Sequence, residues 1–188
     1  GDFLNVSRLQ TGKFMIDRKQ TNMAQLVREE VDGIQQIAAL HDVTMNCTVP
    51  ERFPVLYVDG DKLRQVIMNF VDNAIYYSPE QTKVEVKLEI ADGDAVLTVT
   101  DQGMGVPEAA QHQLFTKFFR AENARKQRPD GTGIGLYLAK KIIDGHGGQV
   151  IFSSNPGEGS TFGFRLPIKR LSEPPAAEEI SDQPKTTS

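Results

Sequence analysis

The sequence predicts an α+β fold, a two-layer α/β sandwich in which about three helices cover one face of a mixed, mostly antiparallel sheet. Two observations lead to this fold class. Three segments read as helices, with apolar residues three and four positions apart: 22–40, 62–77 and about 134–145. Other segments alternate apolar and polar residues, as half-buried strands do: 42–49, 83–90, 95–101, 149–154 and 160–167. A length of 188 residues is enough for one such domain with a sizeable core.

Composition narrows the classes of protein to which the chain can belong. It is 39% hydrophobic and 24% charged, as expected of a soluble globular domain, and we expect neither a membrane span nor a preceding signal peptide. The net charge of −4 argues against a general nucleic-acid binder. Cys47 is the single cysteine, which excludes an internal disulfide and fits a reducing compartment. We interpret Cys47 as a structural residue, on the same face of the strand 42–49 as Val43, Met45 and Val49.

The first half of the chain is predicted to alternate helix and strand. The opening segment 3–9 has apolar residues at helical spacing and resembles the end of a longer helix. After the first complete helix and strand, segment 55–58 can form a short strand. Asp59 or Asp61 is then predicted to cap the helix over 62–77.

The second half begins with a hairpin whose pattern leaves little ambiguity. Segment 83–90 alternates strictly, "ADGD" supplies a turn, and "AVLTVTD" returns as the antiparallel partner. Counting by two along this second strand places Asp101 on an inward face, where a carboxylate needs a hydrogen-bonding partner. A connection over 102–133 follows, with a short helix predicted around 109–119. Connections of this length inside a domain are usually functional or mobile.

The helix over 62–77 carries polar side chains beside its apolar stripe. Asn69, Asn73 and Tyr77 follow one another at intervals of four, so they share one side of the helix. One interpretation is a pair of buried asparagines that bond to backbone groups. The other is that the amide oxygens face a hydrated Mg²⁺ ion and its phosphates, since neutral oxygen ligands suit a hard cation that keeps several waters.

Two glycine-rich motifs and a basic segment lie further along the chain. In "DQGMGVP", residues 101–107, Gly103 and Gly105 allow a sharp turn or the close approach of a ligand. In "GTGIGL", residues 131–136, glycines lead into a helix whose N–H groups can hold an anion. The second motif is neither a Walker P-loop nor a Rossmann fingerprint. The segment 116–129 between them carries an excess of four positive charges, which is either a solvated surface or a lid over a polyphosphate.

The order and spacing of these motifs resemble the catalytic ATP-binding domain of bacterial sensor histidine kinases, in the ATPase group that includes the gyrase B subunit and MutL. The resemblance runs from about residue 20 to 169. The N box of that family corresponds to "QVIMNFVDNAIYYSP", the G1 box to "DQGMGVP", the F box to "FTKFF" and the G2 box to "GTGIGL". The implied fold is the Bergerat-type ATP-binding sandwich, and the implied cofactors are ATP and Mg²⁺.

The resemblance also implies roles for individual residues. Asp101 would accept a hydrogen bond from the adenine amino group, Asn69 and Asn73 would hold Mg²⁺ and the phosphates, and Arg120 would approach the γ-phosphate. Tyr77 would pack along the nucleotide. The remaining residues of the implied nucleotide site are Phe118 and the G1-box and G2-box residues Gly103, Gly105, Gly131, Thr132, Gly133, Gly135 and Leu136.

The same resemblance implies a domain division and partners. Residues 1–16 would end the preceding dimerisation and phosphotransfer helix, residues 17–170 would form the catalytic domain, and residues 171–188 would be a disordered tail. The implied partners are a phospho-acceptor histidine domain, in the same or a dimeric partner chain, and a response regulator. We expect a cytoplasmic location and no nucleic-acid partner. The full-length protein would be a homodimer and this fragment a monomer.

Two departures from the family pattern keep alternatives open. The family commonly has a lysine where this chain has Tyr76, so a pseudokinase-like regulatory module is the first alternative. The histidines, His41, His112 and His146, are interpreted as surface or capping residues, and none has the context of a phospho-acceptor. A gyrase B or MutL type of ATP hydrolase is the second alternative. It commonly needs a glutamate where this chain has Asn69.

Overall fold

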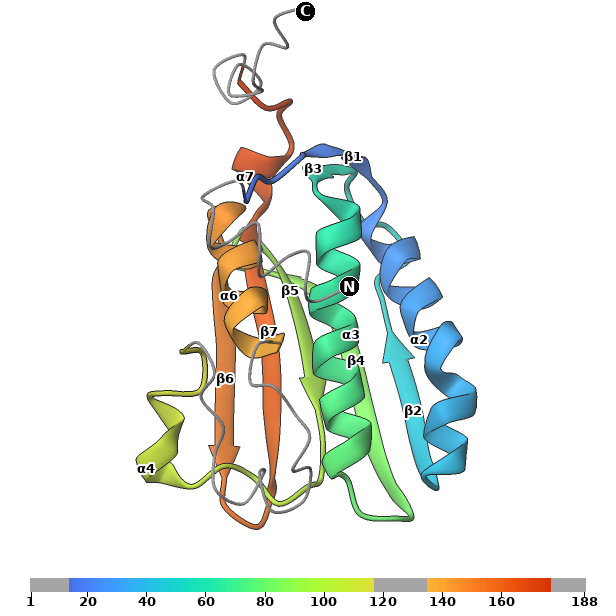
Figure 1. Ribbon diagram of the computed structural model, residues 1–188. Helices are drawn as coiled ribbons and strands as arrows, with labels where there is room; N and C mark the ends of the chain where they lie inside the picture. Colours follow the sequence, from blue (N-terminus) through green and yellow to red (C-terminus); the bar gives the residue numbers. More distant parts are fainter. Residues whose placement is uncertain (1–13, 117–134, 177–188) are drawn as a thin grey trace, which may run out of the picture.

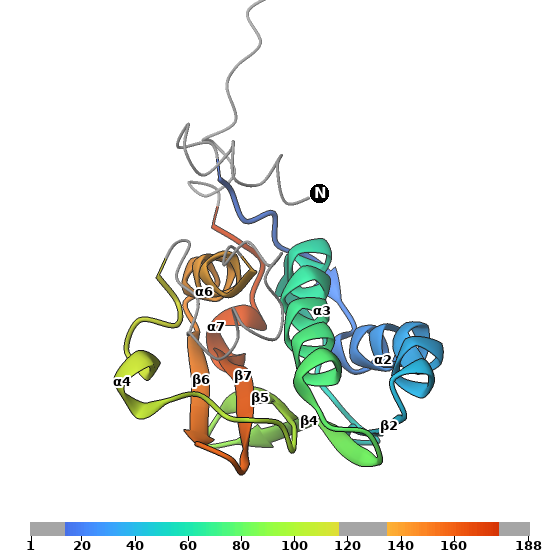
Figure 2. The same cartoon turned by 60° about the horizontal axis from the view of Figure 1, so that its bottom comes forward.

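The computed structural model describes residues 14–116 and 135–176, and it confirms the predicted α+β sandwich. A five-stranded sheet in the order β2-β4-β5-β7-β6 forms one layer, and α2, α3 and α6 lie across one of its faces (Figures 1 and 2). A two-stranded sheet of β1 and β3 lies at one end. The helices are α2 (Met23–Leu40), α3 (Gly60–Tyr77), α4 (Glu108–Gln111), α6 (Gly135–Gly145) and α7 (Ile168–Leu171). The strands are β1 (Lys19–Thr21), β2 (Val43–Thr48), β3 (Leu56–Val58), β4 (Thr82–Ala91), β5 (Asp94–Thr100), β6 (Gln149–Asn155) and β7 (Gly159–Pro167).

The sheet is mixed, as predicted. The edge strand β2 pairs in parallel with β4, whereas β4–β5, β5–β7 and β7–β6 are antiparallel pairs. The alternation read from the sequence of β4 is present, because Val84, Val86 and Leu88 are buried against the helices. Ile90 belongs to the same face but is 48% exposed, since it lies next to the turn into β5. The sheet therefore buries one face along most of its length.

Helix α3 is the central helix of the layer. Its side chains at the predicted apolar positions are all buried: Leu63, Val66, Ile67, Phe70, Val71, Ala74 and Ile75. The helix begins at Gly60, and the N-cap carboxylate of Asp59 accepts the backbone N–H of Lys62 at 3.2 Å. In the same way, Asn22 caps α2. The periodicity and the caps thus position α3 with one side in the core and the adjacent side toward α6.

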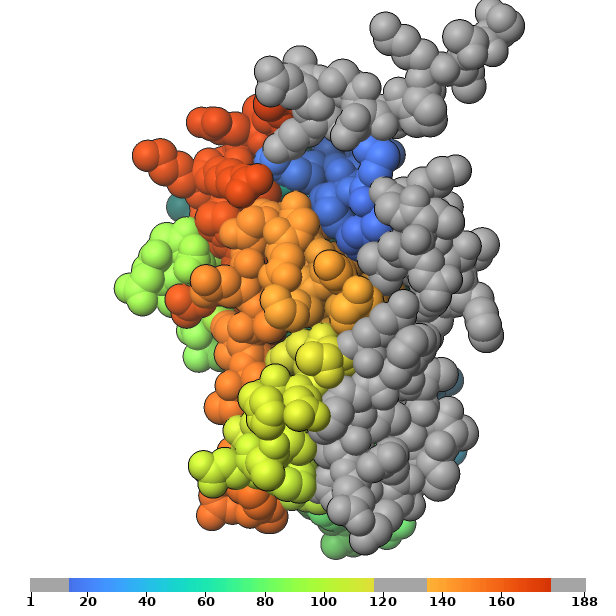
Figure 3. All heavy atoms as spheres, turned by 60° about the vertical axis from the view of Figure 1, so that its left-hand side comes forward, coloured from blue at the N-terminus to red at the C-terminus, as the bar shows by residue number. Residues whose placement is uncertain are grey.

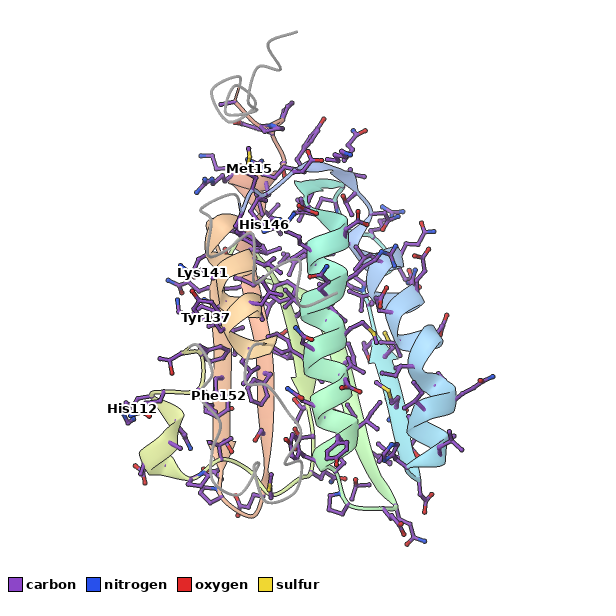
Figure 4. All side chains as sticks on the ribbon, viewed as in Figure 1. Met15, His112, Tyr137, Lys141, His146 and Phe152 are labelled. Atoms are coloured by element: carbon purple, nitrogen blue, oxygen red, sulfur yellow. The ribbon has the colours of Figure 1, made fainter. Side chains whose placement is uncertain are left out.

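A buried polar network joins the start of α3 to the end of α6, at the upper end of both helices in Figure 4. The backbone N–H of Asp59 donates to Nε2 of His146 at 2.9 Å, so Nδ1 carries the proton and donates to the carbonyl of Ile142 at 2.8 Å. The Asp59 carboxylate accepts the ammonium of Lys62 and the backbone N–H of Asp17, both at 2.9 Å. Burial of its side chain lowers the pKa of His146 and favours the neutral imidazole.

Several sequence-based expectations are corrected by the structure. Cys47 is exposed rather than core-facing, because β2 is an edge strand and only Val43 and Met45 on it are buried. The short helix expected over 109–119 has only the four residues of α4 within the described part. The histidines were predicted to be surface or capping residues: His41 and His112 are exposed C-cap residues of α2 and α4, and His146 is 1% exposed but bonds to the carbonyl of Ile142 in the last turn of α6.

Two other expectations concern the ends of the chain. The predicted helix over 3–9 lies outside the described residues, as does most of the predicted tail. Helix α7 was not expected, and the assignment of Leu171 to the disordered tail is wrong, because this residue ends α7 and is fully buried in the core. Within the described ranges, no helix is long and apolar enough to cross a membrane.

Candidate functional site

Two of the predicted site residues, Asn69 and Gly135, meet where the C-terminal half of α3 contacts the start of α6. Asn69 on α3 donates from Nδ2 to the backbone carbonyl of Gly135 at 3.2 Å. A Cβ on Gly135 would lie 3.4 Å from Cγ of Asn69, so the two helices are in direct contact at this point. This bond crosses 66 residues of sequence and brings the N box and the end of the G2 box together.

The side of α3 that carries Asn69, Asn73 and Tyr77 is half-buried rather than fully buried. The interpretation of two buried asparagines is therefore wrong in its burial, although Asn69 does bond to a backbone group. A half-exposed amide can exchange water for a ligand without the large desolvation cost of a buried one. Asn69, Asn73 and Tyr77 can therefore offer polar atoms to a ligand along this half-buried side of α3.

Asp101 follows directly after β5 and is buried, with 8% of its surface exposed. Its Oδ1 accepts two backbone N–H groups, from Gly103 at 2.8 Å and from Ser160 at 3.3 Å. Within the described ranges, both of its side-chain hydrogen bonds end on Oδ1, and Oδ2 receives none. Burial raises the pKa of Asp101, and the two N–H donors offset that effect only in part. With respect to the described residues, Asp101 thus has one carboxylate oxygen fixed by two donors and the other left as an acceptor.

The glycines of the G1 box are required by close contacts within the protein. A Cβ on Gly103 would lie 2.7 Å from the carbonyl oxygen of Tyr77, so the loop after β5 packs directly on the end of α3. Gly105 has φ +70°, and a Cβ there would lie 2.6 Å from the carbonyl oxygen of Asn155. These contacts place Tyr77 and Asp101 at the same end of the sandwich.

Leu136, at the start of α6, is partly buried and packs against the core. The other predicted site residues lie outside the described residues: Phe118, Arg120, Gly131, Thr132 and Gly133. The chain just before this gap is placed by aromatic contacts, because the Phe115 ring lies 6.5 Å from that of Phe152 and 6.4 Å from that of Phe162. Figure 3 shows this segment, in yellow, beside α6 and β6.

Two residues that the sequence did not single out contact the G1 loop, by which we mean the segment 101–107 that follows β5. Ser160 on β7 donates its backbone N–H to Asp101, and the hydroxyl of Ser154 on β6 accepts the backbone N–H of Val106 at 2.8 Å. The available signal was the position of both serines on the inward face of the last hairpin, flanking the turn "NPGEG". Hydroxyls on the core face of a hairpin need partners, and here the G1 loop supplies one.

This fold and this site define an ATP-binding domain class, with a central helix bearing asparagines, a carboxylate after an inner strand and a glycine-led helix beside them. Residues 58–170 match the family described as "Histidine kinase-, DNA gyrase B-, and HSP90-like ATPase". The chain belongs to this family, as a catalytic domain of the sensor histidine kinase type.

Curated relatives agree with this assignment. The chain is 34% identical over 171 residues to the adaptive-response sensory kinase SasA of a Synechococcus species, covering 90% of this chain and 45% of that protein. It is 30% identical over 175 residues to the circadian input-output histidine kinase CikA of Synechococcus elongatus, covering 92% of this chain and 23% of the relative. The chain therefore spans less than half the length of each of these relatives.

Solved structures also resemble the fold. Full-length ShkA, solved in complex with AMPPNP, matches with a TM-score of 0.76 and 25% identity over 88% of this chain and 34% of that one. The nucleotide-free catalytic domain of the histidine kinase ThkA matches with a TM-score of 0.69 and 25% identity, over 80% of this chain and 95% of that one.

Proposed function

We propose that the chain binds Mg·ATP and passes the γ-phosphoryl group to a histidine on a domain outside this chain, as the kinase part of a two-component sensor. The observation that carries the proposal is the buried Asp101, which fixes one oxygen with two backbone donors and leaves the other as an acceptor. An adenine amino group is a neutral donor that fits a single oxygen of a largely buried carboxylate. The AMPPNP complex of the structural relative ShkA supports this choice of ligand.

The asparagine row fits the phosphate part of the ligand. Asn69 donates its Nδ2 to Gly135, so its Oδ1 would be the atom that accepts from or coordinates a ligand, and Asn73 lies one turn further along the same half-buried side. Amide oxygens suit Mg²⁺, which prefers oxygen ligands and keeps several waters. When bound, Mg²⁺ would neutralise charge on the phosphates. Arg120, Phe118 and the glycines 131 and 133 complete the proposed site.

The chain's own residues would act mainly by positioning. Phosphoryl transfer needs little covalent participation from a protein, and it gains most from alignment and from charge stabilisation. Asp101 would orient the base, the asparagines would orient the metal-bearing phosphates, and the N-terminal end of α6 would favour an anion. The acceptor histidine would be on a preceding domain of the same or a partner chain, in a homodimer, with a response regulator as the next acceptor.

Calorimetric titration of ATP tests the nucleotide half of this proposal. We expect binding that requires Mg²⁺, and we expect Asn73→Ala to weaken it by roughly tenfold or more, because a metal-facing oxygen is lost. Asn46→Ala, an exposed asparagine on β2, is the matched control and should bind as the unchanged chain does. Equal binding with Mg²⁺ and with a chelator would contradict the magnesium site.

Phosphoryl transfer from γ-labelled ATP tests the enzymatic half in the parent protein. We expect an acid-labile, base-stable label on a histidine outside residues 1–188. A parent protein that binds ATP but never becomes labelled would leave the nucleotide site standing and remove the kinase activity.

A second candidate function is favoured by Tyr76. Its ring lies 5.3 Å from that of Tyr77 and 6.3 Å from that of His41, so an aromatic cluster occupies the end of α3 where the family commonly carries a cation. A regulatory module that binds nucleotide weakly would fit this cluster. Undetectable ATP binding by the intact chain would favour this second function.

A further inference from the structure

The side chain of Ser154 lies at the point where the G1 loop meets the β6–β7 hairpin. Its hydroxyl accepts the backbone N–H of Val106 at 2.8 Å and donates to the carbonyl of Gly159 at 3.0 Å. The hydroxyl of Ser160 lies 3.0 Å away. Since a hydroxyl has one proton and two lone pairs, the Ser160 hydroxyl is the donor in this pair, and Ser154 uses its full hydrogen-bonding capacity.

Further bonds join the same two segments on either side of Ser154. The side-chain amide of Gln111 donates to the carbonyls of Val106 at 3.0 Å and of Ser154 at 3.3 Å. The backbone N–H of Gly157, in the hairpin turn, donates to the carbonyl of Met104 at 2.8 Å. The G1 loop is therefore held to the hairpin at several points between residues 101 and 111.

The backbones of the loop and of the hairpin turn also approach each other closely at two glycines. Gly159 has φ +108°, and a Cβ there would lie 2.1 Å from the carbonyl oxygen of Asp101. The close approaches of Gly159 to Asp101 and of Gly105 to Asn155 show that the hairpin turn packs directly against the G1 loop. The shape of the loop is thus set by a segment about 50 residues later in the chain, and the Val106 bond alone spans 48 residues.

We propose that Ser154 is a positioning residue for the nucleotide-binding loop: its hydroxyl ties Val106 to the β6–β7 hairpin and so holds Asp101 in the orientation that presents Oδ2. The proposal rests on the proposed ATP-binding function of the same site. Loss of the hydroxyl leaves the Val106 N–H without its acceptor, so the loop samples other positions and the base-binding carboxylate is less well placed.

Calorimetry with ATP and ADP on the variant Ser154→Ala tests this role. We expect the affinity for both nucleotides to fall roughly tenfold, which corresponds to the loss of one hydrogen bond that holds the loop. The two losses should be equal, because the G1 loop would bear the base and not the γ-phosphate. Ser154→Thr keeps the hydroxyl and should bind within a factor of about three of the unchanged chain. Ser153→Ala, exposed on the opposite face of β6, is the matched control and should change nothing.

Amide hydrogen exchange without nucleotide provides a second, independent readout. The Val106 amide should exchange at least about tenfold faster in Ser154→Ala than in the unchanged chain. Faster exchange with unchanged nucleotide affinity would make Ser154 a structural residue only and would overturn the proposal. If Ser154→Ala does not fold, Gln111→Ala is measured instead, because the Gln111 amide joins the same loop to β6 through the carbonyls of Val106 and Ser154. It should weaken the binding of both nucleotides by a smaller, equal factor, and unchanged binding would overturn the proposal.

The unchanged chain separates this proposal from the function on which it rests. If it binds neither ATP nor ADP, the proposed function fails, and the role of Ser154 in it fails with it. If it binds both nucleotides and Ser154→Ala binds them equally well, the proposed function stands and only the role of Ser154 is overturned.

Discussion

The two ends of the α3–α6 pair use polar side chains in opposite ways. At one end, Asp59 and His146 are nearly inaccessible, and both oxygens and both ring nitrogens have hydrogen-bond partners. At the other end, Asn69 and Asn73 are half-buried, and Asp101 uses one carboxylate oxygen for two bonds. A saturated network stabilises the fold, whereas half-exposed polar atoms can still accept hydrogen bonds from a ligand. Variants at the two ends should therefore separate stability from binding.

The largest effect is expected for Asp101→Asn at the ligand end. An amide replaces the acceptor oxygen partly by a donor, so ATP affinity should fall by roughly 100-fold or more. Stability should move the other way. Since burial raises the pKa of Asp101, its contribution to stability is present below pH 3.8 and is lost as the pH rises through the folded-state pKa. At neutral pH an asparagine carries no charge, so the variant avoids the cost of keeping an ionised carboxylate buried and its free energy of unfolding should rise.

Thermal unfolding and calorimetry check both halves of the Asp101→Asn prediction. Asp92→Asn in the exposed β4–β5 turn is the control, because it makes the same chemical change outside the site. A lower melting temperature together with unchanged ATP affinity would reverse the comparison between the two ends.

The next effect is expected at the saturated end, from His146→Ala. This change removes a fully buried ring and leaves the Asp59 N–H without its acceptor, so the free energy of unfolding should fall by about 2–4 kcal/mol. ATP affinity of the folded protein should stay within a factor of about two, because the network lies at the far end of both helices. Urea unfolding measures the loss, with the exposed His112→Ala as control. A loss of affinity without a loss of stability would contradict this division of roles.

Dependence of stability on pH sharpens the same comparison. Burial places the pKa of His146 below 6.5, so on acidification the unfolded chain takes up a proton before the folded one does. The contribution of this residue is complete above pH 6.5 and is lost as the pH falls further. Asp59 favours the protonated ring, and Arg18 and Lys62 oppose it. Urea unfolding between about pH 7.5 and pH 5.5 should show this decline in the unchanged chain, and His146→Ala should show less of it. Parallel curves would assign the decline to other groups.

Sequence reasoning succeeded where one element carries the information. The apolar stripe of α3 follows from helical spacing, and counting by two along β5 placed Asp101 on an inward face. It failed where a contact joins distant segments. The Asp59–His146 bond spans 87 residues and the Asp101–Ser160 bond spans 59, so no local pattern contains either pair. Cys47 shows the same limit, because its alternation was read correctly but its place on an edge strand was not visible.

The smallest effect is expected for Tyr76→Lys, which tests the one feature of the ligand end that departs from the family. The lysine would place a cation beside Tyr77 at a half-exposed position, where charge interactions are weak, so ATP affinity should rise only about threefold. Loss of the ring contacts with Tyr77 and His41 should lower the free energy of unfolding by about 0.5–1.5 kcal/mol. Tyr76→Gln separates the two effects, because it removes the ring without adding charge. Should binding be detectable only in Tyr76→Lys, the regulatory function would replace the kinase function, because a single cation would then decide whether the pocket holds its ligand.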